Sequence, residues 1–291
     1  MDQITMKVGI TGAYGFVGSH LMDALIPMPG VEVEPFDRER HDLFRKESLK
    51  HFVEDKEVIF HLAGVNRDTN ETLIKVNTLG TLNLLESLTA YAKRDILLIY
   101  MSSFQVYQEP IKSELINELH PTHPQNIYGI SNKAAEEIIS CYNFRSIIFR
   151  GSNFFGPRCK PYYNSVISTF CDLLSKNKPF TVYGSGEQGR DFLYISDVIE
   201  VLLRAVHYKP EGIEIVNLCG GKVVTINQII NILSEISGRT VGVQYQNCSE
   251  NEHVIWWGDN TKCKEKFNWV PKIGISEGLK LTYGWFKRNE R

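Results

Sequence analysis

The chain has 291 residues, of which 43% are hydrophobic and 23% charged, so its composition is that of a globular protein and excludes a disordered or fibrous one. A formal net charge of -2 supplies no basic field for a nucleic-acid backbone, and the six cysteines show no C-x-x-C pair or metal-ligand spacing. No apolar run reaches the ~18 residues of a membrane span, and an apolar strand follows Met6 too closely for a signal peptide. We therefore expect a soluble, cytoplasmic protein without a metal, a nucleic-acid partner or a membrane partner.

Short apolar runs alternate with amphipathic stretches through the first half of the chain. The predicted strands are 7–11, 31–36, 58–62, 96–101 and 146–150, and the predicted helices are 16–26, 73–92, 126–142 and 195–206. Strands that alternate with helices imply right-handed β-α-β crossovers, with ligands at the carboxyl ends of the strands. This order predicts an α/β fold with a doubly wound parallel sheet.

The composition of the chain changes after Arg150, where glycines and prolines interrupt the alternation of strands and helices and aromatic residues cluster. We expect residues 1–150 to form a dinucleotide-binding domain, to which residues from about 190 to 216 return. Residues 151–189 and 217–291 are then expected to form a smaller α/β lobe, interleaved with the first, that binds the substrate.

A glycine-rich loop follows the first predicted strand and leads directly into a helix. Its residues are Gly12, Ala13, Tyr14, Gly15, Phe16, Val17 and Gly18. Glycines allow the tight turn, the close approach of a pyrophosphate to the backbone and the packing of helix on strand, while the helix N-terminus favours negative charge. The context of strand, glycines and helix predicts a dinucleotide-binding site.

Asp37 ends the second predicted strand, 19 residues after Gly18. Its carboxylate can accept hydrogen bonds from both hydroxyls of an adenosine ribose and would repel a 2′-phosphate, so NAD is favoured over NADP. Arg38 and Arg40 follow at once and could instead clamp a phosphate, which leaves NADP as an alternative.

The fourth predicted strand ends in Ser102-Ser103-Phe104-Gln105-Val106-Tyr107, and Tyr128-Gly129-Ile130-Ser131 begins 25 residues after Ser103. Together with the glycine loop, these segments resemble the extended short-chain dehydrogenases/reductases that process nucleotide sugars, the NAD-dependent epimerase/dehydratase family. The resemblance covers nearly the whole chain and implies a Rossmann-like fold. It further implies that Tyr128 is the acid/base at a sugar hydroxyl and that Ser103 bonds the same oxygen.

The chain departs from this family pattern one helical turn after the tyrosine. The family has a lysine there, whose charge helps a phenol that otherwise titrates near pH 10, and this chain has Asn132. Lys133 is adjacent, but one residue rotates a side chain by ~100° around a helix, toward another surface. Asn132 can still hydrogen-bond a nicotinamide ribose, although it supplies no charge. Ile127, Ile130, Ala134, Ile138 and Tyr142 are expected to form the apolar face of this helix.

Three interpretations of Asn132 remain open from the sequence. The favoured one is an active enzyme whose tyrosine is helped by the charge of the cofactor, a helix terminus or a cation from elsewhere. The second is an enzyme slowed by the missing charge. The third is a binding protein that holds the cofactor or a nucleotide sugar without turning it over.

The resemblance also implies contacts for further residues. His61-Leu62-Ala63-Gly64 matches the strand end beside the cofactor, where Leu62 and Ala63 are the expected contacts and His61 is expected to be structural. Asn77 matches an asparagine on the long helix near the active site. Six residues are expected to bind the substrate. Ser103 and Gln105 belong to this set, Asn153 and Arg190 are expected at the diphosphate, Tyr183 at the base and Asp259 near the nucleotide ribose.

The residues directly after Ser103 narrow the type of reaction. Family members that dehydrate the sugar have acidic groups there, and this chain has Phe104 and Gln105, so we predict that it is not a 4,6-dehydratase. A 4-epimerase that oxidises sugar C4 transiently is favoured, and a 4-ketoreductase using NADH or NADPH is the alternative. The stretches 61–67 and 159–170 resemble the 4-ketoreductases of bacterial capsule and O-antigen sugar pathways, and this resemblance implies a role in cell-surface polysaccharide biosynthesis. The predicted helices 73–92 and 126–142 resemble those through which the family forms homodimers.

Overall fold

The computed structural model describes residues 5–163, 165–247 and 255–289. The chain forms two compact units, the first from Met1–Glu109, His120–Gly151 and Ile199–Val216 and the second from Pro110–Leu119, Ser152–Val198 and Asn217–Arg291. These limits differ from the predicted ones, since residues 110–119 belong to the second unit and the chain returns to the first at residue 199 instead of about 190. In the described part of the chain, no helix is long and apolar enough to cross a membrane.

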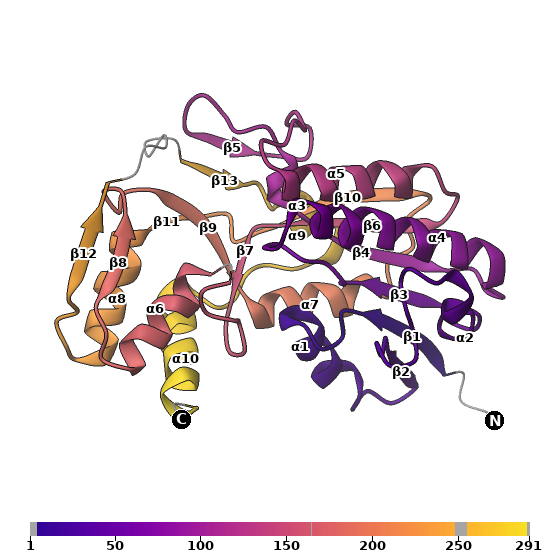
Figure 1. The fold of residues 1–291 in the computed structure, drawn as a ribbon, viewed down its shortest axis with the longest axis horizontal. Coiled ribbons are helices and arrows are strands. Elements are labelled where there is room, and N and C mark those ends of the chain that lie inside the picture. The colour runs from indigo at the N-terminus through magenta and orange to yellow at the C-terminus, as the bar shows by residue number, and fades with distance from the viewer. Residues whose placement is uncertain (1–4, 164, 248–254, 290–291) are drawn as a thin grey trace. The chain divides into compact units, whose positions relative to one another are not determined.

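The first unit contains a six-stranded sheet in the order β10-β6-β4-β3-β1-β2 (Figure 1). Neighbouring strands run parallel from β6 to β2. Sequence order proceeds outward from β1 in both directions, so the carboxyl end of β1 lies at the switch point where such sheets bind ligands. The strands are β1 (Met6–Thr11), β2 (Val31–Pro35), β3 (Val58–His61), β4 (Leu97–Ser103), β6 (Arg145–Gly151) and β10 (Ile213–Leu218).

The helices of the first unit follow the strands as predicted, with one irregularity. The predicted helix 73–92 is present as α3 (Asn70–Leu73) and α4 (Gly80–Tyr91), joined by the π-helical segment η2 (Ile74–Leu79). Such π segments are rare inside helices and often mark functional sites. The other elements are α1 (Phe16–Leu25), η1 (Lys46–Leu49), α2 (Lys50–Val53), η3 (Phe104–Val106), α5 (Ile127–Ser140) and α7 (Ile195–Ala205), which continues from the second unit.

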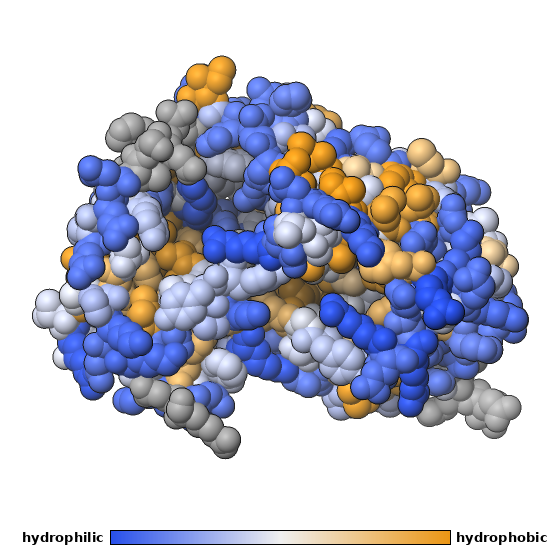
Figure 2. All heavy atoms as spheres, in the orientation of Figure 1, coloured by the Kyte–Doolittle hydropathy of each residue, from blue (hydrophilic) through white to orange (hydrophobic). Residues whose placement is uncertain are grey.

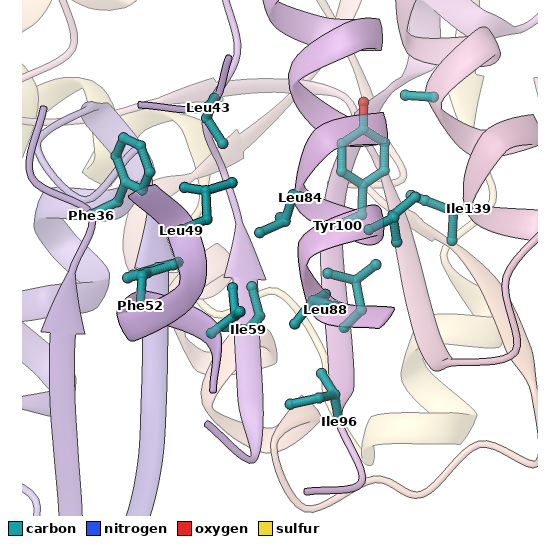
Figure 3. Close-up of a cluster of buried hydrophobic side chains, with 14 of the residues drawn as sticks. Phe36, Leu43, Leu49, Phe52, Ile59, Leu84, Leu88, Ile96, Tyr100 and Ile139 are labelled. Carbon is teal, nitrogen blue, oxygen red and sulfur yellow. The ribbon is translucent and has the colours of Figure 1, made fainter. Parts of the chain in front are cut away.

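One face of the sheet is covered by α2, α4 and α5. Alternate residues of a strand point to the same face, and here Ile59 of β3 with Leu98 and Tyr100 of β4 form a single buried cluster with residues of the three helices (Figure 3). Full burial of an aliphatic or aromatic side chain contributes ~1.5–3 kcal/mol. The helical members of the cluster include Phe52, Val53, Leu84, Leu85, Leu88, Ala135 and Ile139.

The stripe of α5 that carries Tyr128 is buried although it is polar. Asn132 and Glu136 of this stripe are buried with Ala135 and Ile139, whereas Ile130 on the apolar face is 41% exposed. The polar residues of the buried stripe have hydrogen-bond partners inside the unit.

In the described residues, the second unit is built from small sheets and the four helices that the first unit does not contain. One sheet has the order β11-β9-β7, and β12 and β13 pair in parallel with β8 and β5. The elements are β5 (Glu114–Ile116), β7 (Asn153–Phe155), β8 (Phe180–Tyr183), β9 (Gly189–Tyr194), β11 (Val223–Thr225), β12 (Val243–Gln246), β13 (Trp256–Gly258), α6 (Val166–Ser175), α8 (Ile226–Ser237), α9 (Thr261–Phe267) and α10 (Ile275–Arg288).

Candidate active site

The loop between β1 and α1 has the close backbone packing that a dinucleotide cradle needs. Gly12 has a φ of +69°, and a Cβ there would lie 2.6 Å from the carbonyl carbon of Leu62. The Gly15 N–H donates to the Gly12 carbonyl at 2.9 Å and closes the turn. Gly15 is also the N-cap of α1 and has no side chain to occupy the first N–H groups of the helix, so these can bind a phosphate. The residues present therefore fit the pyrophosphate of NAD.

Asp37 lies just beyond β2, with its carboxylate held by its own turn. Its Oδ1 accepts from the Glu39 N–H at 3.0 Å, and Arg40 Nε lies 3.8 Å from its Oδ2. His41 Nδ1 accepts from the Asp37 backbone N–H at 3.2 Å. The Asp37 carboxylate is therefore positioned by its own turn, and its oxygens can accept hydrogen bonds from ribose hydroxyls.

A chain of hydrogen bonds runs through His61 at the end of β3. Thr81 Oγ1 donates to the Asn77 carbonyl at 2.6 Å, so it must accept from His61 Nε2 at 2.9 Å. The other ring nitrogen, Nδ1, then accepts from Thr11 Oγ1 at 2.7 Å, and Thr11 Oγ1 accepts from the Ala63 N–H at 3.2 Å. These bonds fix the ends of β1 and β3 against η2 and the start of α4.

Asn77 of η2 joins the loop after β3 to α5. Its Oδ1 accepts from the Val65 N–H at 2.9 Å, and its Nδ2 donates to the Val65 carbonyl at 2.8 Å and to Ser131 Oγ at 3.0 Å. Ser131 Oγ in turn donates to the Tyr128 carbonyl at 2.8 Å. Asn77 therefore connects the strand end that carries Leu62 and Ala63 with the turn of α5 that carries Tyr128.

A close contact between η3 and α5 holds the segment after Ser103 against the turn that carries Tyr128. A Cβ at Gly129 would collide with the Gln105 carbonyl oxygen, so only glycine allows the first turn of α5 to approach this closely. Gln105 Oε1 accepts from Asn126 Nδ2 at 2.5 Å, and Asn126 caps α5 by accepting from the Gly129 N–H. Ser103 is buried and caps η3 through the Gln105 N–H at 3.2 Å. The sequence Tyr-Gly at the helix start thus has a direct steric reason.

Asn132 lies one turn after Tyr128 and is buried. Its Nδ2 donates to the Tyr128 carbonyl at 2.8 Å, and its Oδ1 lies 3.1 Å from the Tyr100 hydroxyl. Lys133 Nζ lies 2.5 Å from Glu137 Oε1 and 3.9 Å from Glu136 Oε2. Both glutamates follow Lys133 along α5, so these ion pairs hold its ammonium toward the C-terminal side of the helix, away from the turn of Tyr128.

A buried ion pair lies one further turn along α5. Arg150 of β6 donates to both oxygens of Glu136, from Nε at 3.0 Å and Nη2 at 2.7 Å, and Ser102 Oγ donates to Glu136 Oε1 at 2.6 Å. The Arg150 guanidinium also lies 4.7 Å from the centre of the Tyr107 ring. A bidentate pair of this kind is geometrically demanding, so it fixes α5 relative to β4 and β6.

In the second unit, the loop from Gly184 to Gly189 is held by Asn227 of α8. The Asn227 N–H donates to the Gly186 carbonyl at 3.0 Å, and its Nδ2 donates to the Ser185 carbonyl at 3.1 Å and to Glu187 Oε1 at 2.5 Å. Tyr245 of β12 donates to Asn227 Oδ1 at 3.0 Å. These bonds order the loop between the exposed side chains of Tyr183 and Arg190.

Asp191 is the buried centre of the second unit. Its carboxylate accepts from the N–H groups of Gly220 and Gly221 at 2.7 and 2.9 Å and from Ser152 Oγ at 3.0 Å. Burial raises the pKa of this carboxyl, and the donated hydrogen bonds oppose the rise. The Asn153 side chain donates to the Asp191 carbonyl at 2.9 Å. Asp191 thereby fixes the strand that carries Arg190.

The predicted site residues fall into two groups, one in each unit. The first unit brings the glycine loop, Leu62, Ala63, Asn77, Ser103, Tyr128 and Asn132 to the carboxyl ends of β1, β3 and β4. The second contains Asn153, Tyr183, Arg190 and Asp259, whose Oδ1 accepts from the Thr261 N–H at 2.9 Å. Sequence reasoning missed Tyr100, Asp191 and the partner of Glu136, which is Arg150. The spacing of Tyr128, Asn132 and Glu136 does predict that the three lie on one helix stripe.

The amino-acid sequence of this chain also matches a protein-family model. Residues 8–219 match the NAD dependent epimerase/dehydratase family. The chain belongs to this family. Among other members, the UDP-glucuronate 4-epimerase of Thermodesulfobacterium geofontis is 33% identical over 260 residues, which cover 85% of this chain and 78% of the relative.

Solved structures of family members share the fold over the full length. The UDP-glucose 4-epimerase of Thermotoga maritima, solved with UDP-glucose, has a TM-score of 0.88 and 27% identity, covering 98% of this chain and 100% of that one. The UDP-glucuronic acid 4-epimerase of Bacillus cereus, solved with NAD, has a TM-score of 0.85 and 26% identity over the same shares of the two chains. The predicted α/β class and the Rossmann-like parallel sheet are confirmed.

Proposed function

We propose that this family member is an NAD-dependent nucleotide-sugar 4-epimerase. The observation that carries the proposal is the contact of Gly129 with the Gln105 carbonyl, because it holds the turn with Tyr128 against the segment that begins at Ser103. Similarity to UDP-sugar 4-epimerases over most of the chain supports the same reaction and a UDP-sugar as substrate.

Tyr128 is the proposed acid/base. As the phenolate, its oxygen takes the proton of the sugar 4-hydroxyl during oxidation, and as the phenol it returns that proton when the ketone is reduced, while the Ser103 hydroxyl bonds the same sugar oxygen. NAD, held by the residues of the first unit, would supply the acceptor for the hydride of C4. Inversion requires the keto sugar to present its other face before the hydride returns. Asn132 keeps hydrogen-bonding capacity at this position but adds no positive charge.

The cofactor is proposed to contact residues at the carboxyl ends of the strands in the first unit. The pyrophosphate binds the backbone of the glycine loop, Asp37 binds the adenosine ribose, and Asn132 and Tyr128 bind the nicotinamide ribose. The full proposed set is Gly12, Tyr14, Gly15, Phe16, Val17, Gly18, Asp37, Leu62, Ala63, Asn77, Tyr128 and Asn132.

The proposed substrate contacts are the residues that the family resemblance implies. Ser103 and Gln105 bind the sugar, and Asn153 and Arg190 bind the diphosphate, where the planar guanidinium matches phosphate oxygens in pairs. Tyr183 borders the base and Asp259 the nucleotide ribose. Asn227 supports the contact of Arg190 because it orders the preceding loop.

The reaction is tested by identifying the nucleotide released from the purified protein and incubating the protein with UDP-sugars, with and without NADH or NADPH. We expect bound NAD and interconversion of 4-epimers without added reductant, and loss of at least 100-fold in kcat for Tyr128→Phe, since acid–base groups contribute ~10²–10⁴-fold. Consumption of reduced cofactor by a 4-keto sugar alone would establish the reductase instead. Tight binding of NAD and UDP-sugar without turnover would establish a binding protein.

We further propose that the enzyme acts in the cytoplasm as a homodimer that supplies nucleotide sugars for cell-surface polysaccharide. Cys141, Cys159, Cys171, Cys219 and Cys263 are free thiols, which suits a reducing compartment. Apolar side chains gather over α3, α4 and α5, where Leu79 is 47% and Ile130 41% exposed (Figure 2). A surface of this kind supports a subunit interface.

A further inference from the structure

Tyr100 and Asn132 form a buried hydrogen bond between β4 and α5. Their side chains are 3% and 4% exposed, and the Tyr100 hydroxyl lies 3.1 Å from Asn132 Oδ1. The amide cannot be turned around, because its nitrogen donates to the Tyr128 carbonyl, which can only accept. The Tyr100 hydroxyl is therefore the donor, and Asn132 Oδ1 is the acceptor.

Because its oxygen accepts from Tyr100, the Asn132 amide offers a hydrogen-bond donor to a further group. The amide nitrogen carries two hydrogens, and the Tyr128 carbonyl uses one of them. We propose that Tyr100 is a positioning residue, which holds the Asn132 amide so that its second hydrogen is available to a ribose hydroxyl of the nicotinamide half of NAD. The inference rests on the proposed contact of Asn132 with the cofactor.

A phenylalanine at position 100 would keep the packing of the ring and lose only the hydroxyl. The ring belongs to the buried cluster beneath α5, and the hydroxyl oxygen lies at its tip (Figure 3). A buried hydroxyl costs free energy unless it is bonded, and here it bonds to Asn132. Burial, with the nearby Tyr128 and Glu136, raises the pKa of the Tyr100 hydroxyl well above its usual range, so it stays a donor at any working pH.

The neighbouring cations Lys133 and Arg150 are paired with glutamates and do not replace the hydrogen bond between Tyr100 and Asn132. Lys133 is held by Glu137 at 2.5 Å, and Arg150 is held by Glu136 through two hydrogen bonds. The buried stripe of α5 therefore presents a neutral amide after Tyr128, and the orientation of that amide depends on Tyr100.

The experiment compares Tyr100→Phe with Tyr142→Phe, in which the lost hydroxyl belongs to a ring stacked on Phe144 at the end of α5. The dissociation constant of NAD is measured by calorimetry on each protein after bound nucleotide is removed, and kcat is measured with NAD saturating. One hydrogen bond is worth ~0.5–1.5 kcal/mol, so we expect NAD to bind ~3- to 10-fold more weakly to Tyr100→Phe. Tyr142→Phe should bind NAD as the wild type does, and the KM for the sugar should stay unchanged in both.

A double-mutant cycle separates positioning from a general loss of stability. Asn132→Leu keeps the branched shape of the side chain and removes the amide, and we expect it to weaken NAD binding by itself. Adding Tyr100→Phe should then weaken binding no further, because Tyr100 acts through Asn132. Multiplying losses, or wild-type affinity in Tyr100→Phe, would overturn the inference. NAD binding is measured without sugar, so a failure to epimerise any nucleotide sugar would overturn the proposed function alone.

Discussion

His61 is a buried, uncharged imidazole whose two ring nitrogens are both committed. Nε2 donates to Thr81 and Nδ1 accepts from Thr11, so both ring nitrogens are hydrogen-bonded without a second proton on the ring. Burial lowers the pKa of His61 to about 4 from its usual 6.5. The folded protein therefore resists a proton that the unfolded chain accepts.

This difference predicts a dependence of stability on pH. Between pH 6.5 and 4 the unfolded chain binds more protons at His61, so the stabilisation is complete above pH 6.5 and is lost as the pH falls toward 4. The loss amounts to about 3 kcal/mol in the free energy of unfolding. Urea unfolding at pH 7 and pH 4 should show it for the wild type and not for His61→Gln, whose side chain does not titrate in this range. Equal pH dependence in the two proteins would contradict the account.

The residues of the site were predicted unevenly, for a physical reason. Gly12, Gly18 and Tyr128 lie in short segments whose local spacing carries the signal, and the structure gives each a local geometric role. Tyr100 and Asp191 were missed because their partners, Asn132 and Gly220, are 32 and 29 residues away in the chain. Hydrogen bonds between distant segments leave no local periodicity to read.

At the scale of elements, the start of α8 has a role beyond its own helix. Asn227 lies within the capping box of Thr225 and Gln228 and turns its side chain to the loop that precedes Arg190. It donates to Ser185 and Glu187 and accepts from Tyr245, so a single side chain joins two residues of the loop to β12. The helix terminus thus sets the conformation of a loop proposed to bind the diphosphate.

Removing this side chain is expected to weaken nucleotide binding selectively. Asn227→Ala should raise the dissociation constant of UDP about tenfold, which corresponds to the loss of one or two net hydrogen bonds of ~1 kcal/mol each. The affinity for NAD should stay unchanged. Asn231→Ala is the matched control, because Asn231 is an exposed asparagine one turn further along α8. Equal UDP affinities of the two variants would show that the loop does not depend on Asn227.

The elements themselves could be predicted where a local pattern exists. The five predicted strands and the helices 16–26, 126–142 and 195–206 agree with the structure to within two residues at each end. The assignment of residues 110–119 to the second unit could not be predicted, because it comes from pairing of β5 with β13, whose register joins Glu114 to Trp256. The π segment within 73–92 was missed for a similar reason, since Asn77 bonds to Val65 and to Ser131 of another helix.

At the scale of the whole molecule, the surface of the first unit over α3, α4 and α5 bears on subunit assembly. A groove there is lined by Phe44, Asn70, Glu71, Ile74, Lys75, Leu79 and Asn83. Contiguous apolar surface is uncommon on monomers, and a two-fold axis would bring each such residue near its own copy in the second chain. A charge introduced on this surface would therefore weaken the proposed homodimer.

A glutamate at Leu79 or Ile130 should dissociate the dimer. Each subunit would bring a carboxylate into an apolar interface, and burying an unpaired charge costs several kcal/mol. Light scattering at micromolar concentration should give twice the chain mass for the wild type and the single-chain mass for Leu79→Glu and Ile130→Glu. Ile26→Glu serves as the control, because Ile26 is 61% exposed after α1 and outside this surface. A monomeric wild type, or dimers in all the variants, would place the interface elsewhere or remove it.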